Sequence, residues 1–69
     1  MTHKEFLVKI GMELKVSRIR KGLERKDICK LTGLALNTIC KIENGTTEGK
    51  ILSYKRIMDA LEVDIKNIL

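Results

Sequence analysis

The chain has 69 residues and a mass of 7.9 kDa, enough for one small domain spanning residues 1–69. Hydrophobic residues make up 43% and charged residues 33%, a mixture that excludes a disordered or membrane-spanning chain. Proline is absent and aromatic residues are 3%, which favours an all-α fold. The net charge of +5 suits an anionic partner. No apolar stretch has the length of a transmembrane or signal segment, so we expect a cytoplasmic protein that does not contact membranes.

Residues that bind metals or carry out catalysis are scarce. Cys29 and Cys40 lie eleven positions apart, and His3 is the only histidine. A structural zinc site needs four such ligands at close spacing, so we expect two reduced thiols, no metal and no cofactor. The sequence has no Ser/His/Asp set, no suitable pair of carboxylates and no glycine-rich phosphate loop. We therefore expect that the protein is not an enzyme.

The chain divides into five predicted helical pieces. Thr2-His3-Lys4-Glu5 has the pattern of a capping box, and the first helix runs from there to Gly22. Three more helices are expected at about residues 25–32, 36–43 and 51–61, and a last turn, residues 65–69, follows Asp64 as its N-cap. Apolar periodicity predicts the inward residues, which are Phe6, Ile10, Leu14, Ile19, Ile28, Leu34, Ile39, Ile42, Ile51, Tyr54, Ile57, Met58 and Leu61.

Residues 25–44 have the pattern of a helix-turn-helix. Gly33 stands at the turn, where a positive φ is needed, and the small Cys29 lies four positions earlier, where the two helices touch. Apolar anchors occur beneath both helices, at Ile28, Leu34, Ile39 and Ile42. The whole set, in register, predicts that the two helices cross at a tight turn.

This segment resembles the phage-repressor/Cro-type (XRE-like) helix-turn-helix family. The matching stretches are Gly22-Leu23, Ile28-Cys29-Lys30-Leu31-Thr32-Gly33-Leu34 and Asn37-Thr38-Ile39-Cys40-Lys41-Ile42-Glu43-Asn44-Gly45. The flanks are also similar to the family pattern, at Ile10-Gly11, Leu14, Arg18 and Ala60-Leu61-Glu62-Val63. The resemblance covers about residues 10–69 and implies a compact five-helix, lambda-repressor-like DNA-binding domain that usually acts as a dimer.

Four positions depart from the family pattern. Ala35, Glu24 and Lys50 stand where capping residues usually begin the third, second and fourth helices, and Glu62 replaces a glycine. These substitutions leave the outward face of the third helix less polar than usual.

The third helix, about residues 36–43, is the predicted recognition helix. At about 100° per residue, Leu36, Asn37, Cys40 and Lys41 lie opposite the two inward isoleucines. We expect these four residues to contact bases in the major groove, with Asn37 on adenine, Leu36 on a thymine methyl and Lys41 on guanine or a phosphate. Alternatively they form a solvated face, and Leu36 and Cys40 pack against a neighbour.

Other residues are expected to contact DNA phosphates. These are Arg25 and Lys26 before the recognition helix, and Asn44, Thr46, Thr47 and Lys50 after it. The lysines could equally be ordinary surface residues. The resemblance also implies a partly buried ion pair between Arg18 and Glu43 that positions two helices.

The C-terminal apolar residues exceed what one short turn must bury. They are expected to form a dimer interface or, alternatively, to close the monomer core, and they are Val63, Ile65, Ile68 and Leu69.

The sequence therefore predicts a sequence-specific double-stranded DNA-binding transcriptional regulator, a repressor in its simplest form, that binds a near-palindromic operator as a homodimer. The alternative is a protein-interaction module with the same fold, such as an antitoxin or the target of an anti-repressor, that binds a regulatory protein partner.

Overall fold

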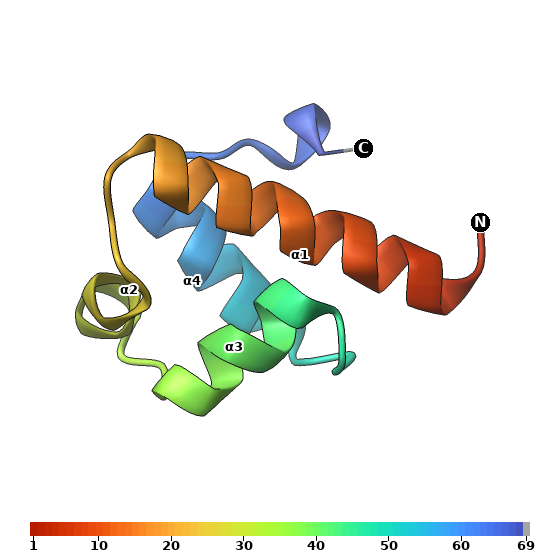
Figure 1. Ribbon diagram of the computed structural model, residues 1–69, viewed down its shortest axis with the longest axis horizontal. Coiled ribbons are helices and arrows are strands. Elements are labelled where there is room, and N and C mark those ends of the chain that lie inside the picture. The colour runs from red at the N-terminus through yellow and green to blue at the C-terminus, as the bar shows by residue number, and fades with distance from the viewer. Residues whose placement is uncertain (69) are drawn as a thin grey trace.

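The computed structural model describes residues 1–68, and within them the chain forms four α-helices and one short 3-10 helix, with no strand (Figure 1). The elements are α1 (His3–Arg20), α2 (Arg25–Thr32), α3 (Leu36–Asn44), α4 (Ile51–Leu61) and η1 (Ile65–Asn67). The radius of gyration is 10.8 Å, close to the about 11 Å of a folded chain of this length. The all-α prediction is confirmed and the molecule is compact.

The prediction of a fifth helical piece over residues 65–69 is wrong in its type and length. Only Ile65–Asn67 are helical, as a single 3-10 turn, and Leu69 lies outside the described residues. Asp64 is its N-cap, as expected, and accepts a hydrogen bond from the Lys66 amide at 3.0 Å. Three residues are too few to sustain an α-helix, which closes its first hydrogen bond only over a full turn.

Local signals place the other helix ends. The Thr2 hydroxyl accepts a hydrogen bond from the Glu5 amide at 3.1 Å, so the predicted capping residue of α1 is confirmed. α2 ends at Gly33, whose φ of 76° is left-handed. At the start of α2, where the family cap is missing, the Glu24 amide donates to the Asp27 carboxylate at 2.8 Å. Glu24 and Asp27 thus form a capping box at the start of α2.

One apolar cluster is buried between the helices. Its members are Ile10, Leu14, Ile28, Ile39, Ile42, Tyr54, Ile57, Leu61 and Ile68, and Leu34 and Met58 pack against it partly buried. Apolar periodicity predicted every member of the cluster except Ile68.

Three residues that were predicted to face the core are exposed instead: Phe6, Ile19 and Ile51. Ile19 follows Leu14 by five positions, which turns it about 140° away from the core face. Ile51 is the first residue of α4 and is 84% exposed. Phe6 belongs to the N-terminal turns of α1, which extend past α4 (Figure 1).

α1 crosses the C-terminal half of α3 at a close backbone approach. Gly11 is buried there, and a Cβ at this position would meet the carbonyl oxygens of Ile42 and Glu43. A Cβ on Gly45 would lie 2.7 Å from the Cα of Val8. These two contacts hold the C-terminal end of α3 against α1, so the first turn of α3 lies on the opposite side of the molecule (Figure 1).

Candidate nucleic-acid interface

The outward face of α3 carries the four residues predicted to contact bases. Leu36 is 53% exposed, Asn37 and Lys41 are exposed, and Cys40 is half-buried. The inward Ile39 and Ile42 are almost completely buried. No side chain caps the start of α3 at Ala35, so its first amide groups keep the partial positive charge of a free helix N-terminus.

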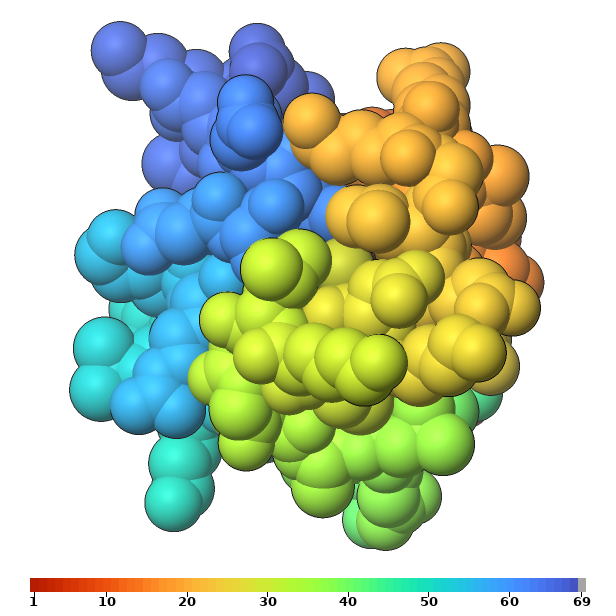
Figure 2. Space-filling model, turned by 90° about the vertical axis from the view of Figure 1, so that its left-hand side faces the viewer, coloured from red at the N-terminus to blue at the C-terminus, as the bar shows by residue number. Residues whose placement is uncertain are grey.

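α2 and α3 form one continuous surface. Figure 2 shows α2, in yellow, beside the green of α3 across the lower half of the molecule, with α4 at their edge. The start of α3 is therefore not isolated, and side chains from α2 and from the start of α4 border it.

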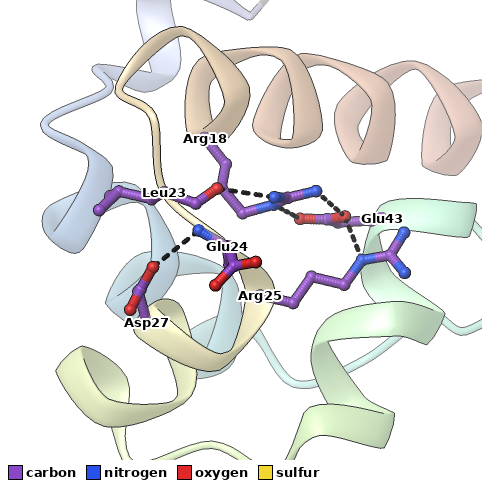
Figure 3. Close-up of polar contacts among 6 residues, drawn as sticks. All are labelled: Arg18, Leu23, Glu24, Arg25, Asp27 and Glu43. Carbon is purple, nitrogen blue, oxygen red and sulfur yellow. Dashed lines mark hydrogen bonds and ion pairs between the residues drawn. The ribbon is translucent and has the colours of Figure 1, made fainter.

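A buried ionic cluster joins α1, α2 and α3 behind this surface (Figure 3). The Arg18 Nε donates to one Glu43 carboxylate oxygen at 2.7 Å, and its Nη2 donates to the other at 3.2 Å. A third Arg18 nitrogen donates to the Leu23 carbonyl oxygen at 2.8 Å. The geometry matches the ion pair expected from the family resemblance.

Arg25 joins the same carboxylate, which sequence analysis did not predict. Its Nε donates to the Glu43 Oε1 at 2.9 Å, and the side chain is 34% exposed. Arg25 lies 18 positions before Glu43, so no local pattern pointed to the contact. Arg25 was predicted to contact a DNA phosphate, and its side chain is oriented by the hydrogen bond to Glu43.

The cluster shifts two pKa values. Burial by itself would raise the pKa of Glu43, but the hydrogen bonds and charges of Arg18 and Arg25 outweigh it and hold this pKa below its ordinary value of 4.5. The pKa of Arg25 lies above its ordinary value, first because Glu43 accepts its hydrogen bond and then because of the negative charge of Glu43. The cluster is thus ionised at neutral pH.

A hollow with basic residues opens at the start of α2. It has a volume of about 390 Å³ and is lined by Arg18, Glu24, Arg25, Lys26 and Leu36. Lys26 also forms an exposed ion pair with Glu24 at 3.2 Å, which holds it only weakly. The hollow meets α3 at Leu36, on one side of the outward face.

A second hollow lies on the other side of α3, where α4 begins. Its volume is about 360 Å³. Lysines and hydroxyl residues make up most of its lining, namely Thr38, Lys41, Thr47, Lys50 and Ser53, and Leu34 and Gly49 complete it. Ammonium and hydroxyl groups are donors that bind phosphate oxygens. Sequence analysis predicted three of these residues for DNA and missed Thr38 and Ser53, which only the packing of α4 beside α3 brings together.

The two remaining residues predicted for phosphates, Asn44 and Thr46, lie elsewhere. Both are exposed near the C-terminal end of α3 and line a shallow hollow with the N-terminal turns of α1. The Thr46 hydroxyl donates to the Lys41 carbonyl oxygen at 3.3 Å. Asn44 lies eight residues, or about 12 Å of helix, from Leu36.

The residues predicted for a dimer interface separate into two environments. Ile68 is buried and Val63 packs partly buried against the core, so both help to close the monomer, whereas Leu69 lies outside the described residues. Ile65 is half exposed and borders an apolar groove of about 590 Å³ between α4 and η1. Val63 borders the same groove and so belongs to both environments; the other lining residues are Ile51, Lys55, Met58, Asp59, Glu62 and Asp64.

Two further features of residues 1–68 concern ligands for metals and the apolar length of the helices. No group of three or more His, Cys, Asp or Glu side chains there is placed to hold a metal ion. None of the helices in this range combines the length and apolar character that crossing a bilayer requires. Comparison with known proteins finds no matching family model and no matching curated protein.

Proposed function

We propose that the protein is a sequence-specific double-stranded DNA-binding transcriptional regulator with a lambda-repressor-like helix-turn-helix fold. In its simplest form it is a repressor that occupies a near-palindromic operator. The observation that carries this proposal is the exposed face of α3 between two hollows that bear basic residues.

The dimensions of DNA support this arrangement. The major groove of B-DNA is about 12 Å wide and admits one α-helix, with a row of phosphates along each edge. With α3 in the groove, one row would meet Arg25 and Lys26, and the other would meet Lys41, Lys50 and the hydroxyls of the second hollow. The net charge of +5 favours such binding at long range.

Base reading would fall to the first turns of α3. The Asn37 amide can form two hydrogen bonds with adenine, and Leu36 can pack on a thymine methyl. Arg18, Arg25 and Glu43 have a positioning role in this proposal, because their hydrogen bonds join the three helices that form the surface.

The apolar groove beside α4 supports a dimer. Two copies packed with α4 antiparallel would cover Ile51, Met58 and Ile65 together. The ion pair between Lys55 and Asp59, at 2.9 Å within one chain, would then have an equivalent between the two copies. A symmetric dimer fits a near-palindromic operator.

The test is fluorescence anisotropy with the DNA just upstream of the protein's own gene and with a scrambled duplex. We expect tighter binding to the upstream DNA. We expect Asn37→Ala to reduce the difference in binding free energy between the two duplexes by about 1–3 kcal/mol. Equal and feeble binding to both duplexes would contradict the proposal.

The salt dependence of binding distinguishes lysines that contact phosphates from lysines that only add to the net charge. Lys50→Ala should weaken binding to both duplexes and lower the slope of log K against log salt by about 0.9. Lys66→Ala removes the same charge from η1, outside both hollows, and should leave the slope unchanged.

The second candidate function is a protein-interaction module on the same fold. Leu36 on α3 and Leu31 on α2 are both exposed, and a DNA-reading surface does not require both. Weak DNA binding without salt dependence, together with the loss of a protein partner in Leu36→Ser, would favour this function.

A further inference from the structure

The outer side of α1 carries a second apolar stripe, formed by Val8, Met12, Val16 and Ile19, which we call the outer stripe. The four positions follow one another at spacings of four, four and three, so they share one face of the helix. Val8, Met12 and Ile19 are exposed and Val16 is half-buried. A soluble helix normally carries polar residues on the face away from the core.

The core does not need this stripe. Ile10, Gly11, Leu14 and Arg18 form the buried face of α1, and the centre of the outer stripe lies about 140° round the helix from them. A hollow of about 460 Å³ lies beside its first half and is lined by Lys4, Glu5, Val8, Lys9 and Met12. Val8, at the N-terminal end of the stripe, also contacts Gly45 at the end of α3. The stripe from Met12 to Ile19 is an apolar face outside the core, with a depression beside Val8 and Met12.

Basic residues border the outer stripe on both edges. Lys4 and Lys15 lie on one edge, and Lys9 and Arg20 lie on the other. None of these four cations has a carboxylate within ion-pair distance in the described range, residues 1–68.

Two acidic residues share this side of α1. Glu5 lies within the stripe and accepts a hydrogen bond from the Thr2 hydroxyl at 3.0 Å, and Glu13 lies beyond the edge that carries Lys9. The surroundings of the stripe keep an excess of positive charge.

The charges argue against a second copy as the occupant. If two α1 helices paired antiparallel about a two-fold axis, each edge would face its own equivalent, which places Lys15 near Lys15 and Lys9 near Arg20. A parallel pair would place one basic edge against the other. Both arrangements bring like charges together, whereas an acidic helix would oppose each basic edge with carboxylates.

The stripe also remains accessible when α3 is occupied. α1 packs against the C-terminal end of α3 through Gly11 and Gly45, and the first turn of α3 lies on the opposite side of the molecule (Figure 1). Val8 lies near Asn44 and Thr46, with which it lines one hollow, so the two surfaces adjoin at this end of the stripe. An occupant along Met12, Val16 and Ile19 would not compete with DNA on the first turns of α3.

We propose that the outer stripe of α1 is the docking site for an acidic amphipathic helix of another protein. The apolar residues of the partner helix pack along Val8, Met12, Val16 and Ile19. Its carboxylates face the lysines and the arginine on the two edges of the stripe. The protein thereby carries a partner-binding surface separate from the proposed DNA-binding surface.

The probe is a synthetic amphipathic peptide about as long as α1, with leucines at spacings of four, four and three and glutamates on both flanks. The matched peptide has lysine in place of every glutamate. Binding is measured by calorimetry and mapped by amide chemical shifts in the full chain. We expect saturable binding of the acidic peptide, shifts confined to α1, and binding at least about tenfold weaker for the lysine peptide.

Met12→Ser should weaken the acidic peptide at least about tenfold, because it removes the centre of the stripe. Leu52→Ser is the matched control, since Met12 is 51% and Leu52 63% exposed, and it should leave peptide binding unchanged. Neither exposed position is needed for folding, and circular dichroism checks this.

Three results would overturn the proposal: no saturable peptide binding, equal binding of the two peptides, or equal loss in Met12→Ser and Leu52→Ser. Binding of phosphatidylglycerol vesicles through Met12, without peptide binding, would also overturn it and assign the stripe to an anionic membrane surface. Operator binding by Met12→Ser tests the proposed function separately, because that variant should bind DNA like the wild type.

Discussion

Glu43 is the residue on which the helix-turn-helix surface depends. Its carboxylate accepts hydrogen bonds from Arg18 on α1 and Arg25 on α2, while its own backbone belongs to α3. The family resemblance predicted the ion pair between Arg18 and Glu43, whereas Arg25 was predicted only to contact a DNA phosphate. The structure shows that Glu43 holds Arg25, and this would support the proposed phosphate contact because a held arginine has less side-chain freedom to lose on binding.

The lowered pKa of Glu43 predicts acid sensitivity. The folded protein holds this carboxylate ionised more strongly than the unfolded chain does, so the unfolded chain binds more protons near pH 4.5 and below. The stabilisation is complete above about pH 4.5 and is lost as the pH falls through the lowered pKa. Urea unfolding from about pH 7 to pH 3 should show this loss in the wild type.

Glu43→Gln should be less stable at neutral pH by about 3–5 kcal/mol, because it leaves the buried Arg18 without its carboxylate. Its stability should also change less between pH 4.5 and pH 3. Arg25→Met keeps the buried pair and should move the loss to higher pH, which leaves a test if Glu43→Gln does not fold. Glu48→Gln, in the exposed loop, is the control, and a pH dependence equal in all variants would contradict the assignment.

At the scale of elements, α1 and α3 meet through a close backbone approach as well as through side chains such as Arg18 and Glu43. Gly11 allows this approach, and helix propensity alone would have favoured alanine at the same position by about 1 kcal/mol. The contact fixes the C-terminal end of α3 against α1.

Gly11→Ala should thus destabilise the protein despite the better helix former. Its Cβ would lie 2.6 Å from the Glu43 carbonyl oxygen, and we expect a loss near the upper end of the about 1–3 kcal/mol range for overpacking. Gly33→Ala is the comparison, since it has open space and only a left-handed φ, for which about 1–2 kcal/mol is expected. Urea unfolding of both variants decides, and a Gly11→Ala variant as stable as the wild type would disprove the close approach.

At the scale of the whole molecule, the structure separates three surfaces. The outward face of α3 with its two hollows lies on one side, the outer stripe of α1 on another, and the apolar groove of α4 and η1 on a third. In a chain of 69 residues, three open surfaces are consistent with a protein that works through contacts with other macromolecules.

The groove of α4 and η1 predicts a concentration-dependent dimer. Sedimentation equilibrium should detect dimers of the wild type, and Ile51→Glu should shift the equilibrium to monomer by at least about tenfold, because it buries a charge in the contact. Met12→Glu places the same charge on the outer stripe and should leave the dimer intact. A wild type that stays monomeric at high concentration would exclude this groove as the interface.

Most of the fold was predictable because its signals are local. Thr2, Gly33 and Asp64 act through hydrogen bonds or φ angles within a few residues, and α2, α3 and α4 begin where they were expected. The errors came where neighbours matter. Ile51 continued an apolar period but lies before α4 meets the core, and residues 65–69 had a cap but not the length for a helix.

The candidate site was predictable on α3 and only partly around it. The inward isoleucines fix which face of one helix is exposed, so Leu36, Asn37 and Lys41 followed from periodicity. Thr38 and Ser53 could not be found in this way, because they become neighbours only when α4 begins beside α3.

Composition and local pattern were enough to predict an all-helical, basic chain with a helix-turn-helix pattern and defined helix ends. These properties depend on composition and on hydrogen bonds that span at most a few residues. Only the tertiary structure decided that Arg25 shares Glu43 with Arg18, that α1 touches α3 through Gly11, and that α1 keeps an apolar stripe outside the core. The physical reason is that burial and pairing at these positions depend on segments far away in the chain, which no local spacing specifies.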